Sequence, residues 1–344
     1  MARITTSQVT INYLGAVEIK GTIECLTGLH IGSSDDAVKI GGISKFVIRD
    51  PVTEEPYIPG SSLKGRMRAL LEKFYSLQAN RNSGEGIYRH ECTDINDALQ
   101  CPVCSLFGST TQESNKMNLP ARLTVRDCPV IGNYKEPGGF DFEKKSENTL
   151  DRLSAHANPR TNERVAKGTK FNFSLKYDVE FASNGECLLL GTHGDDSMEV
   201  FWDFIESDLN NILHALRLIE YAYLGGNGTR GYGQVAFDIQ TDDFAAKNAS
   251  ELVGIRLNLP LTATVESADL GDATTEHAPD EDTAHEHEVI EELMDDRYKP
   301  LRDKIPTIVA QFQTYYEHVF QDAVEAAEEE LTEDATDQPG EDQP

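Results

Sequence analysis

The chain has 344 residues, and its 39% of hydrophobic side chains is enough to bury a core, which excludes a fully disordered protein. No apolar run reaches the roughly 18 residues of a membrane helix, and the N-terminus lacks the layout of a signal peptide, so we expect a cytoplasmic protein with no membrane partner. The formal net charge of −28 argues against a nucleic-acid partner, but residues 262–344 carry 25 acidic and four basic residues, which leaves −7 for residues 1–261.

The first third of the chain predicts a strand, an amphipathic helix and an insertion. Residues 16–25 alternate apolar and polar side chains, as a half-buried strand does. Residues 61–75 carry apolar side chains at helical spacing, and Ser61 or Ser62 is expected to cap the start of this helix. Residues 77–120 then form a long insertion that holds three of the six cysteines.

The rest of the body predicts further strands and one long helix. Residues 121–127 and 171–177 alternate like strands on either side of residues 144–167, a polar, basic stretch without a clear period. An apolar stripe predicts a helix over residues 200–224, and residues 232–239 form a last strand. Strands and helices that mix without regular βαβ repeats indicate an α+β fold, and we expect an antiparallel, modified ferredoxin-like sheet covered by helices.

The composition changes after the body of the protein, which we place at residues 1–261. Residues 262–288 are acidic and of low complexity, which predicts a disordered linker. Residues 289–331 predict an acidic helical appendage divided by its two prolines, and residues 332–344 a disordered tail. The apolar residues of the appendage favour docking on another subunit over a pure solubility tag, and mimicry of nucleic acid is a third alternative.

The densest group of metal-ligating side chains lies in the insertion. Its members are His90, Cys92, Cys101 and Cys104, and the last two form a Cys-x2-Cys pair. Such a pair lets two thiolates bind one tetrahedral ion from a tight turn, and His90 and Cys92 can fill the other two positions. Clustered cysteines in a reducing compartment favour a metal over disulfides. We therefore predict a structural zinc site, and the alternative is a set of unrelated buried cysteines.

A glycine motif with the spacing of a dinucleotide loop runs from Gly226 through Gly228 to Gly231. A helix precedes it and a strand follows it, which is the reverse of the order in dinucleotide-binding folds. Its glycines let a ligand approach the backbone closely, and Arg230 adds a charge suited to phosphate. The alternative interpretation is a tight turn from helix to strand.

Two further basic segments suit an anionic polymer. The predicted helix at residues 61–75 begins with free amides and two hydroxyls and carries Lys64, Arg66 and Arg68, although it lacks the spacing of a Walker motif. Residues 152–164 are expected to form a long polar loop with three arginines. Each segment alone also fits a solvated basic surface.

Together these motifs resemble the RAMP superfamily of CRISPR proteins, and most closely the backbone subunit of type III effector complexes (the Cas-seven group, Csm-three-like members). Four blocks carry the resemblance in the family's order, and they are Leu26–Gly32, Val47–Gly65, Asn148–Arg160 and Tyr223–Gly233. They cover roughly residues 16–240. The run Cys101–Gly108 is also similar to the zinc-bearing insertion of some members.

The resemblance implies an RNA-recognition-motif-like palm with a protruding thumb at residues 144–167. Copies of the chain or sister RAMP subunits would stack along a guide RNA (crRNA), which then pairs with complementary target RNA. The residues that the resemblance and the motifs assign to RNA binding are His30, Gly32, Ser33, Arg49, Gly60, Ser61, Ser62, Lys64, Arg66, Arg68, Arg152, Asn158, Arg160, Arg164, Gly226, Gly228, Arg230 and Tyr232.

Active members of the family cut target RNA with an aspartate that follows the motif Ile-Gly-x-Ile. Here Ser44 follows the motif at Ile40–Ile43, and a serine cannot anchor Mg²⁺ or Mn²⁺ as a carboxylate does, so we expect a subunit that does not cut. Asp35 and Asp36 are weak candidates for an alternative, a metal-dependent endoribonuclease. A further alternative is a guide-processing endoribonuclease with a histidine general base, for which the candidates are His30 and His156.

Overall fold

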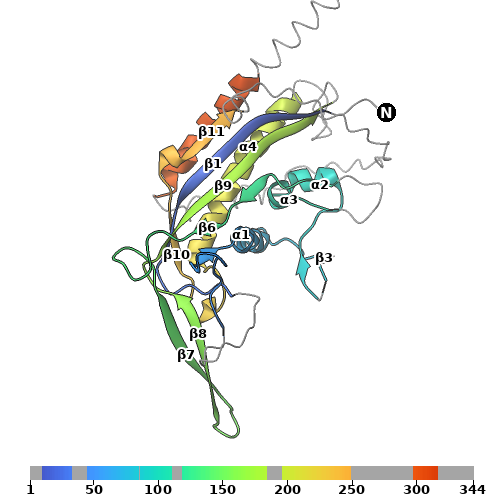
Figure 1. The fold of residues 1–344 in the computed structure, drawn as a ribbon. Helices are drawn as coiled ribbons and strands as arrows, with labels where there is room; N and C mark the ends of the chain where they lie inside the picture. The colour runs from blue at the N-terminus through green and yellow to red at the C-terminus, as the bar shows by residue number, and fades with distance from the viewer. Residues whose placement is uncertain are drawn as a thin grey trace, which may run out of the picture.

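The computed structural model describes residues 10–32, 45–84, 86–110, 118–183, 196–248 and 297–316. An antiparallel sheet forms the centre of the molecule, and helices pack against it (Figure 1). The strand order is β10-β1-β9-β5, and β11 also pairs with β1. This mixed architecture confirms the α+β class. Among the described helices, none is long and apolar enough to cross a membrane.

The sheet is built around one long ladder between its first strand and β9. Its strands are β1 (Thr10–Cys25), β5 (Leu123–Val125), β9 (Lys170–Ser183), β10 (Val235–Asp238) and β11 (Phe244–Asn248). In the β1–β9 ladder, Ile19 lies opposite Leu175 and Ile23 lies opposite Phe171, and all four side chains are fully buried. Burial of each such side chain contributes about 1.5–3 kcal/mol, which explains why the alternating pattern predicted these strands correctly.

Two helices connect the strands of the sheet. Helix α1 (Gly60–Phe74) lies between β1 and β5 in the chain, and α4 (Asp196–Tyr221) lies between β9 and β10. The predicted serine cap of α1 is wrong, because the helix begins at Gly60 and places Pro59 at the cap position without a side-chain bond. The Oδ1 of Asp127 accepts the N–H of Gly60 at 2.7 Å instead, a partner too distant in the chain for local sequence rules to find.

A two-stranded hairpin projects from the sheet, as Figure 1 shows, and we call it the arm. It consists of β7 (Phe142–Leu150) and β8 (Ala157–Val165). The expectation of a long loop over residues 152–164 is therefore wrong, since only residues 151–156 connect the two strands. Polar side chains on both faces of the hairpin leave no apolar alternation from which a strand could have been predicted.

The remaining elements are short. They are the paired strands β2 (Tyr57–Ile58) and β6 (Cys128–Pro129), the paired strands β3 (Arg81–Asn82) and β4 (Tyr88–Arg89), the helices α2 (Ile95–Gln100) and α3 (Cys104–Phe107), and the 3-10 turns η2 (Gly228–Arg230) and η3 (Thr241–Asp243). Strands β3 and β4 and helices α2 and α3 all belong to the cysteine-bearing insertion.

A last helix, at residues 299–316, packs on the sheet body of its own chain. The ring of Tyr316 lies 5.7 Å from that of Phe181 on β9 and 6.0 Å from that of Trp202 on α4. The side chains that this helix buries in the common core are Leu301, Ile305, Ile308, Val309 and Phe312. Pro306 does not divide the helix as predicted, because the missing N–H removes a single bond while the whole apolar face stays packed. The predicted linker and tail, residues 262–288 and 332–344, lie outside the described residues.

Candidate metal centre and nucleic-acid interface

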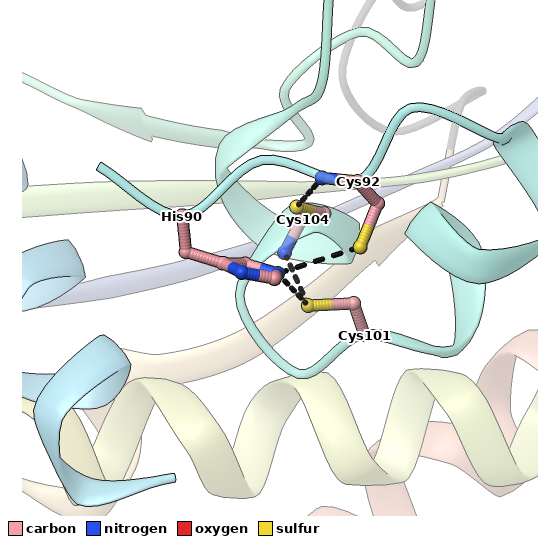
Figure 2. Close-up of side chains that lie close together, drawn as sticks. All are labelled: His90, Cys92, Cys101 and Cys104. Carbon is pink, nitrogen blue, oxygen red and sulfur yellow. Dashed lines mark hydrogen bonds between the residues drawn. The ribbon is translucent and has the colours of Figure 1, made fainter. Parts of the chain in front are cut away.

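Four potential metal ligands converge in the insertion. His90, Cys92, Cys101 and Cys104 point toward one another, as Figure 2 shows, and their ligand atoms all lie within 4.8 Å of one another. The Nε2 of His90 lies 3.4 Å from the Sγ atoms of both Cys92 and Cys101. A nitrogen and a sulfur bound to one tetrahedral zinc ion lie about 3.6 Å apart, given bond lengths of about 2.1 and 2.3 Å. The group therefore could hold a metal ion.

Backbone contacts hold these ligands in place. The Nδ1 of His90 donates to the carbonyl of Gln78 at 3.0 Å, so Nε2 turns its lone pair toward the thiols. The backbone N–H groups of Cys92 and Cys104 donate to the sulfurs of Cys104 and Cys101, both at 3.4 Å.

A buried polar network joins the insertion to the sheet body. The Oγ of Ser105 on α3 donates to Oδ1 of Asp208 on α4 at 2.6 Å, and the hydroxyl of Tyr177 on β9 donates to Oδ2 at 2.8 Å. The guanidinium of Arg122, also buried, lies 3.7 Å from the same carboxylate. Burial raises the pKa of Asp208, and these three partners satisfy its oxygens in the core.

Two of the basic residues of α1 that are predicted to bind RNA make hydrogen bonds within the chain. Arg68 donates to the carbonyl of His90 at 2.7 Å and so holds the backbone beside the metal ligands. Lys64 donates to the carbonyl of Leu123 at 2.6 Å, and burial lowers its pKa. We define the glycine loop as residues 225–233. Of the three basic residues of α1, Arg66 contacts Tyr223, whose ring packs against Gly228 of this loop.

Three cations on aromatic rings border the glycine loop. The guanidinium of Arg66 lies 4.2 Å from the ring centre of Tyr223, and its Nε donates to the Tyr223 carbonyl at 2.9 Å. On the side of the arm, Lys145 and Arg164 lie 4.5 and 4.8 Å from the ring centre of Tyr232. The loop and the base of the arm thus form one junction, and an anionic polymer would meet positive charge on both of its sides.

Glycine is required in this loop for two different reasons. A Cβ atom at Gly228 would lie 2.0 Å from Cγ of Tyr223, so only glycine lets the loop close over that ring. Gly225 has a φ of +76°, and a Cβ there would lie 2.5 Å from the carbonyl oxygen of His30. The backbone of the loop therefore packs directly against Tyr223 and His30 at these two positions.

Carboxylates of the arm pair with the cations of the junction. Arg164 lies 2.5 Å from Glu143, and Arg230 lies 3.1 Å from Glu147. Arg49 makes a third pair with Glu163 at 2.7 Å. Sequence reasoning missed these acidic residues, although Glu143, Lys145 and Glu147 alternate along β7 and so share one face of the arm. Five cations face three carboxylates here, so the junction keeps a positive surplus, and these cations are Arg49, Arg66, Lys145, Arg164 and Arg230.

The other predicted site residues are spread more widely. The start of α1, with Gly60, Ser61 and Ser62, lies against β5, where a Cβ at Gly60 would be 2.3 Å from the Val125 carbonyl oxygen. Of the predicted RNA-binding residues, Asn158 and Arg160 are exposed on β8, and Arg152 is exposed in the connection between β7 and β8. Gly32 forms an isolated bridge with Val47, and His30 lies beside the glycine loop. The residues outside the described structure are Ser33, Asp35, Asp36 and Ser44.

Two Csm3 crystal structures are among the solved structures to which this chain is similar. The crystal structure of a Csm3–Csm4 subcomplex is 25% identical to this chain, with a TM-score of 0.38, and the match covers 71% of this chain and 86% of that chain. The crystal structure of Csm3 from Methanopyrus kandleri is 22% identical, with a TM-score of 0.39, and the match covers 70% of this chain and 79% of that chain.

Curated relatives are more similar in sequence. A protein named CRISPR system Cms endoribonuclease Csm3 from Methanothermobacter thermautotrophicus is 38% identical over 236 residues, which cover 64% of this chain and 82% of the relative. A protein of the same name from Enterococcus italicus is 34% identical over 247 residues, which cover 68% of this chain and 97% of the relative. The family model of the RAMP superfamily matches residues 22–236. Because this match spans most of the body and the curated relatives align over most of their own length, the chain belongs to the RAMP superfamily.

Proposed function

We propose that this chain is a guide-RNA-binding backbone subunit of a type III CRISPR interference complex, in antiviral defence. The observation that carries the proposal is the cationic junction between the arm and the glycine loop, found in a chain whose curated relatives are named Csm3. Copies of the chain or sister RAMP subunits would stack along one guide RNA. The guide would then pair with complementary target RNA, so base pairing reads the sequence while the protein binds backbone and shape.

The palm of this subunit would be a modified ferredoxin-like sheet. Two strand–helix–strand units, β1-α1-β5 and β9-α4-β10, interleave to give the order β10-β1-β9-β5, which supports this topology. The arm would act as the thumb beside the guide–target duplex. Its exposed arginines and its length fit a contact with phosphates along that duplex.

Within the junction, the residues divide into two roles. Arg66 and Arg230 would contact guide phosphates, because Arg66 stacks on Tyr223 beside the glycine loop and Arg230 belongs to the loop. Lys145 and Arg164, stacked on Tyr232, would hold the arm to the loop and add to the positive field. Phosphate contacts of this kind bind every sequence equally, as a guide-binding subunit requires.

The group of His90, Cys92, Cys101 and Cys104 would hold a structural zinc ion. Three thiols and one imidazole are soft ligands that suit Zn²⁺, and a closed set of four leaves no position for a substrate. When bound, the ion would fix the fold of an insertion that has little core of its own. Two hydrogen bonds would link the ordered insertion to the rest of the protein. They are the bond from Arg68 to the His90 carbonyl and the bond from Ser105 to Asp208.

We further propose that this subunit does not cut target RNA, because Ser44 stands where active members carry an aspartate. The alternative, metal-dependent cleavage with Mg²⁺ or Mn²⁺, is favoured by the word endoribonuclease in the names of the relatives. Incubation of the guide-loaded complex with complementary RNA and Mg²⁺ or Mn²⁺ separates the two. Intact target is expected; regular cleavage that is lost in Asp35→Ala or Asp36→Ala would establish the alternative, and cleavage of a guide precursor would establish processing.

RNA binding itself is tested by fluorescence anisotropy of full-length protein with labelled single-stranded RNA. We expect Arg66→Ala and Arg230→Ala each to weaken binding about tenfold and to lower the slope of log affinity against log salt by about one. Lys299→Ala is the matched control, since this exposed cation lies on the C-terminal helix far from the junction in sequence. Equal effects of all three variants would contradict a phosphate-binding junction.

A further inference from the structure

His30 lies where the arm meets the glycine loop, and only 4% of its surface is exposed. Its carbonyl accepts the N–H of Gly226 at 2.8 Å, and the adjacent Leu29 pairs with Val165 of the arm. Two glycines border the imidazole: a Cβ at Gly32 would lie 3.6 Å from Nε2, and one at Gly226 would lie 3.6 Å from Cδ2. Because neither residue has a side chain, neither covers the Nε2 edge of the ring.

The contacts of His30 fix which of its nitrogens carries the proton. Nδ1 lies 2.7 Å from the backbone carbonyl oxygen of Glu163. A carbonyl can only accept, so Nδ1 is the donor, and Nε2 of the neutral ring bears a lone pair. Burial lowers the pKa of His30, and the charge of Lys45 lowers it further, which keeps the ring neutral near pH 7. Among the described residues, we find no donor to Nε2.

We propose that Nε2 of His30 accepts a hydrogen bond from a ribose 2′-hydroxyl and thereby selects RNA over DNA. The inference rests on the proposed function, and it names the ribose 2′-hydroxyl as the chemical group that the junction recognises. A phosphate oxygen and a neutral Nε2 are both acceptors, so His30 is unsuited to phosphate, which Arg66 and Arg230 are placed to bind. The 2′-hydroxyl is the donor that RNA has and DNA lacks.

A ribose fits this position better than a base does. A subunit that binds guides of any sequence needs contacts that every nucleotide can make. Base N–H groups could also donate to Nε2, but their kind and position differ among the four bases, whereas each RNA nucleotide carries the same 2′-hydroxyl. Nε2 of His30 is a fixed acceptor that lies beside the glycine loop and the two arginines proposed to bind phosphate. It can therefore recognise the sugar without recognising the base.

The test compares RNA with DNA of the same sequence, with deoxyuridine in place of thymidine, for full-length wild-type protein and two variants. In His30→Asn the amide nitrogen takes the place of Nδ1 and can still donate to the Glu163 carbonyl, but no acceptor remains at the Nε2 position. We expect the preference for RNA over DNA to fall about five- to tenfold, with DNA affinity unchanged. His30→Gln, whose Oε1 can reach the Nε2 position, should restore part of the preference.

RNA with 2′-fluoro sugars adds a measurement on the wild-type protein, because fluorine keeps an RNA-like sugar but cannot donate. Wild-type protein should bind it less tightly than RNA, and His30→Asn should bind the two alike. An unchanged RNA-to-DNA ratio in His30→Asn, or equal wild-type affinity for RNA and 2′-fluoro RNA, would overturn the inference and leave the proposed function standing. Failure of the wild-type protein to bind RNA at all would overturn both.

Discussion

The cysteine-bearing insertion and the junction between the arm and the glycine loop are held together by different contacts. In the insertion, four ligands within fifteen residues of one another converge, and a buried carboxylate fastens them to the core. In the junction, residues from α1, the arm and the loop meet through ion pairs and ring contacts that remain partly exposed. Buried polar groups with all their partners stabilise a fold, whereas exposed charges that are only partly neutralised can bind a ligand.

The largest expected effect is on the insertion. Cys104→Ser removes one ligand, so bound zinc should fall from about one equivalent to near zero, and the free energy of unfolding should drop by roughly 5 kcal/mol or more. Elemental analysis and chemical denaturation measure the two quantities. Cys128→Ser, which changes a buried cysteine outside the cluster, should keep its zinc. A Cys104→Ser protein with full zinc content would remove the proposed metal centre.

The link between the insertion and the core should be the next most sensitive. Asp208→Ala leaves the hydroxyls of Ser105 and Tyr177 and the guanidinium of Arg122 without their acceptor, and should cost about 3–5 kcal/mol of unfolding free energy. The exposed Asp203 on the same helix provides the control, and Asp203→Ala should cost less than about 0.5 kcal/mol. Similar losses in both variants would show that the buried network does not fasten the insertion.

In the junction, Gly228→Ala should lower both stability and RNA affinity. The added methyl would overlap the Tyr223 ring, so the loop must move, at an expected cost of about 1–3 kcal/mol. RNA affinity should fall about tenfold, because the backbone that approaches the ligand is displaced. Gly168→Ala, at an open turn with a φ of +86°, strains the backbone outside the loop and should leave RNA affinity unchanged. Unchanged RNA binding in Gly228→Ala would mean that the loop does not contact the guide.

The smallest expected effect comes from the ion pair between Glu147 and Arg230, which should influence RNA affinity with little change in stability. Glu147→Gln releases Arg230, whose side chain is 57% exposed, so unfolding free energy should change by less than about 1 kcal/mol. RNA affinity should rise about two- to fivefold, because a phosphate no longer competes with the carboxylate. Glu136→Gln, which changes an exposed carboxylate bonded to Asn133, is the control. Weaker RNA binding in Glu147→Gln would show that this pair positions the arm.

Periodic and local features could be predicted from the sequence, and non-local ones could not. The group of four candidate metal ligands was predicted because the spacing of Cys101 and Cys104 alone brings two thiols into one turn. Helix α1 was found from its apolar face, but its cap was not, because Asp127 comes from another part of the chain. The hydrogen bond from Arg68 to the His90 carbonyl could not be predicted either, because the two residues lie 22 positions apart. A basic side chain on a helix surface carries no local sign of which partner it will meet.

The sequence by itself determined the α+β class, the family motifs and the four-ligand cluster, since each depends on spacing along a single segment. Tertiary structure alone decided that the polar stretch of residues 144–167 contributes most of a hairpin, and that the carboxylates of β7 and β8 pair with Arg49, Arg164 and Arg230. Tertiary structure also decided which charges lie together at the junction. The sequence total of −28 concerns the whole chain, whereas an RNA would meet only the few charges that folding brings to one junction.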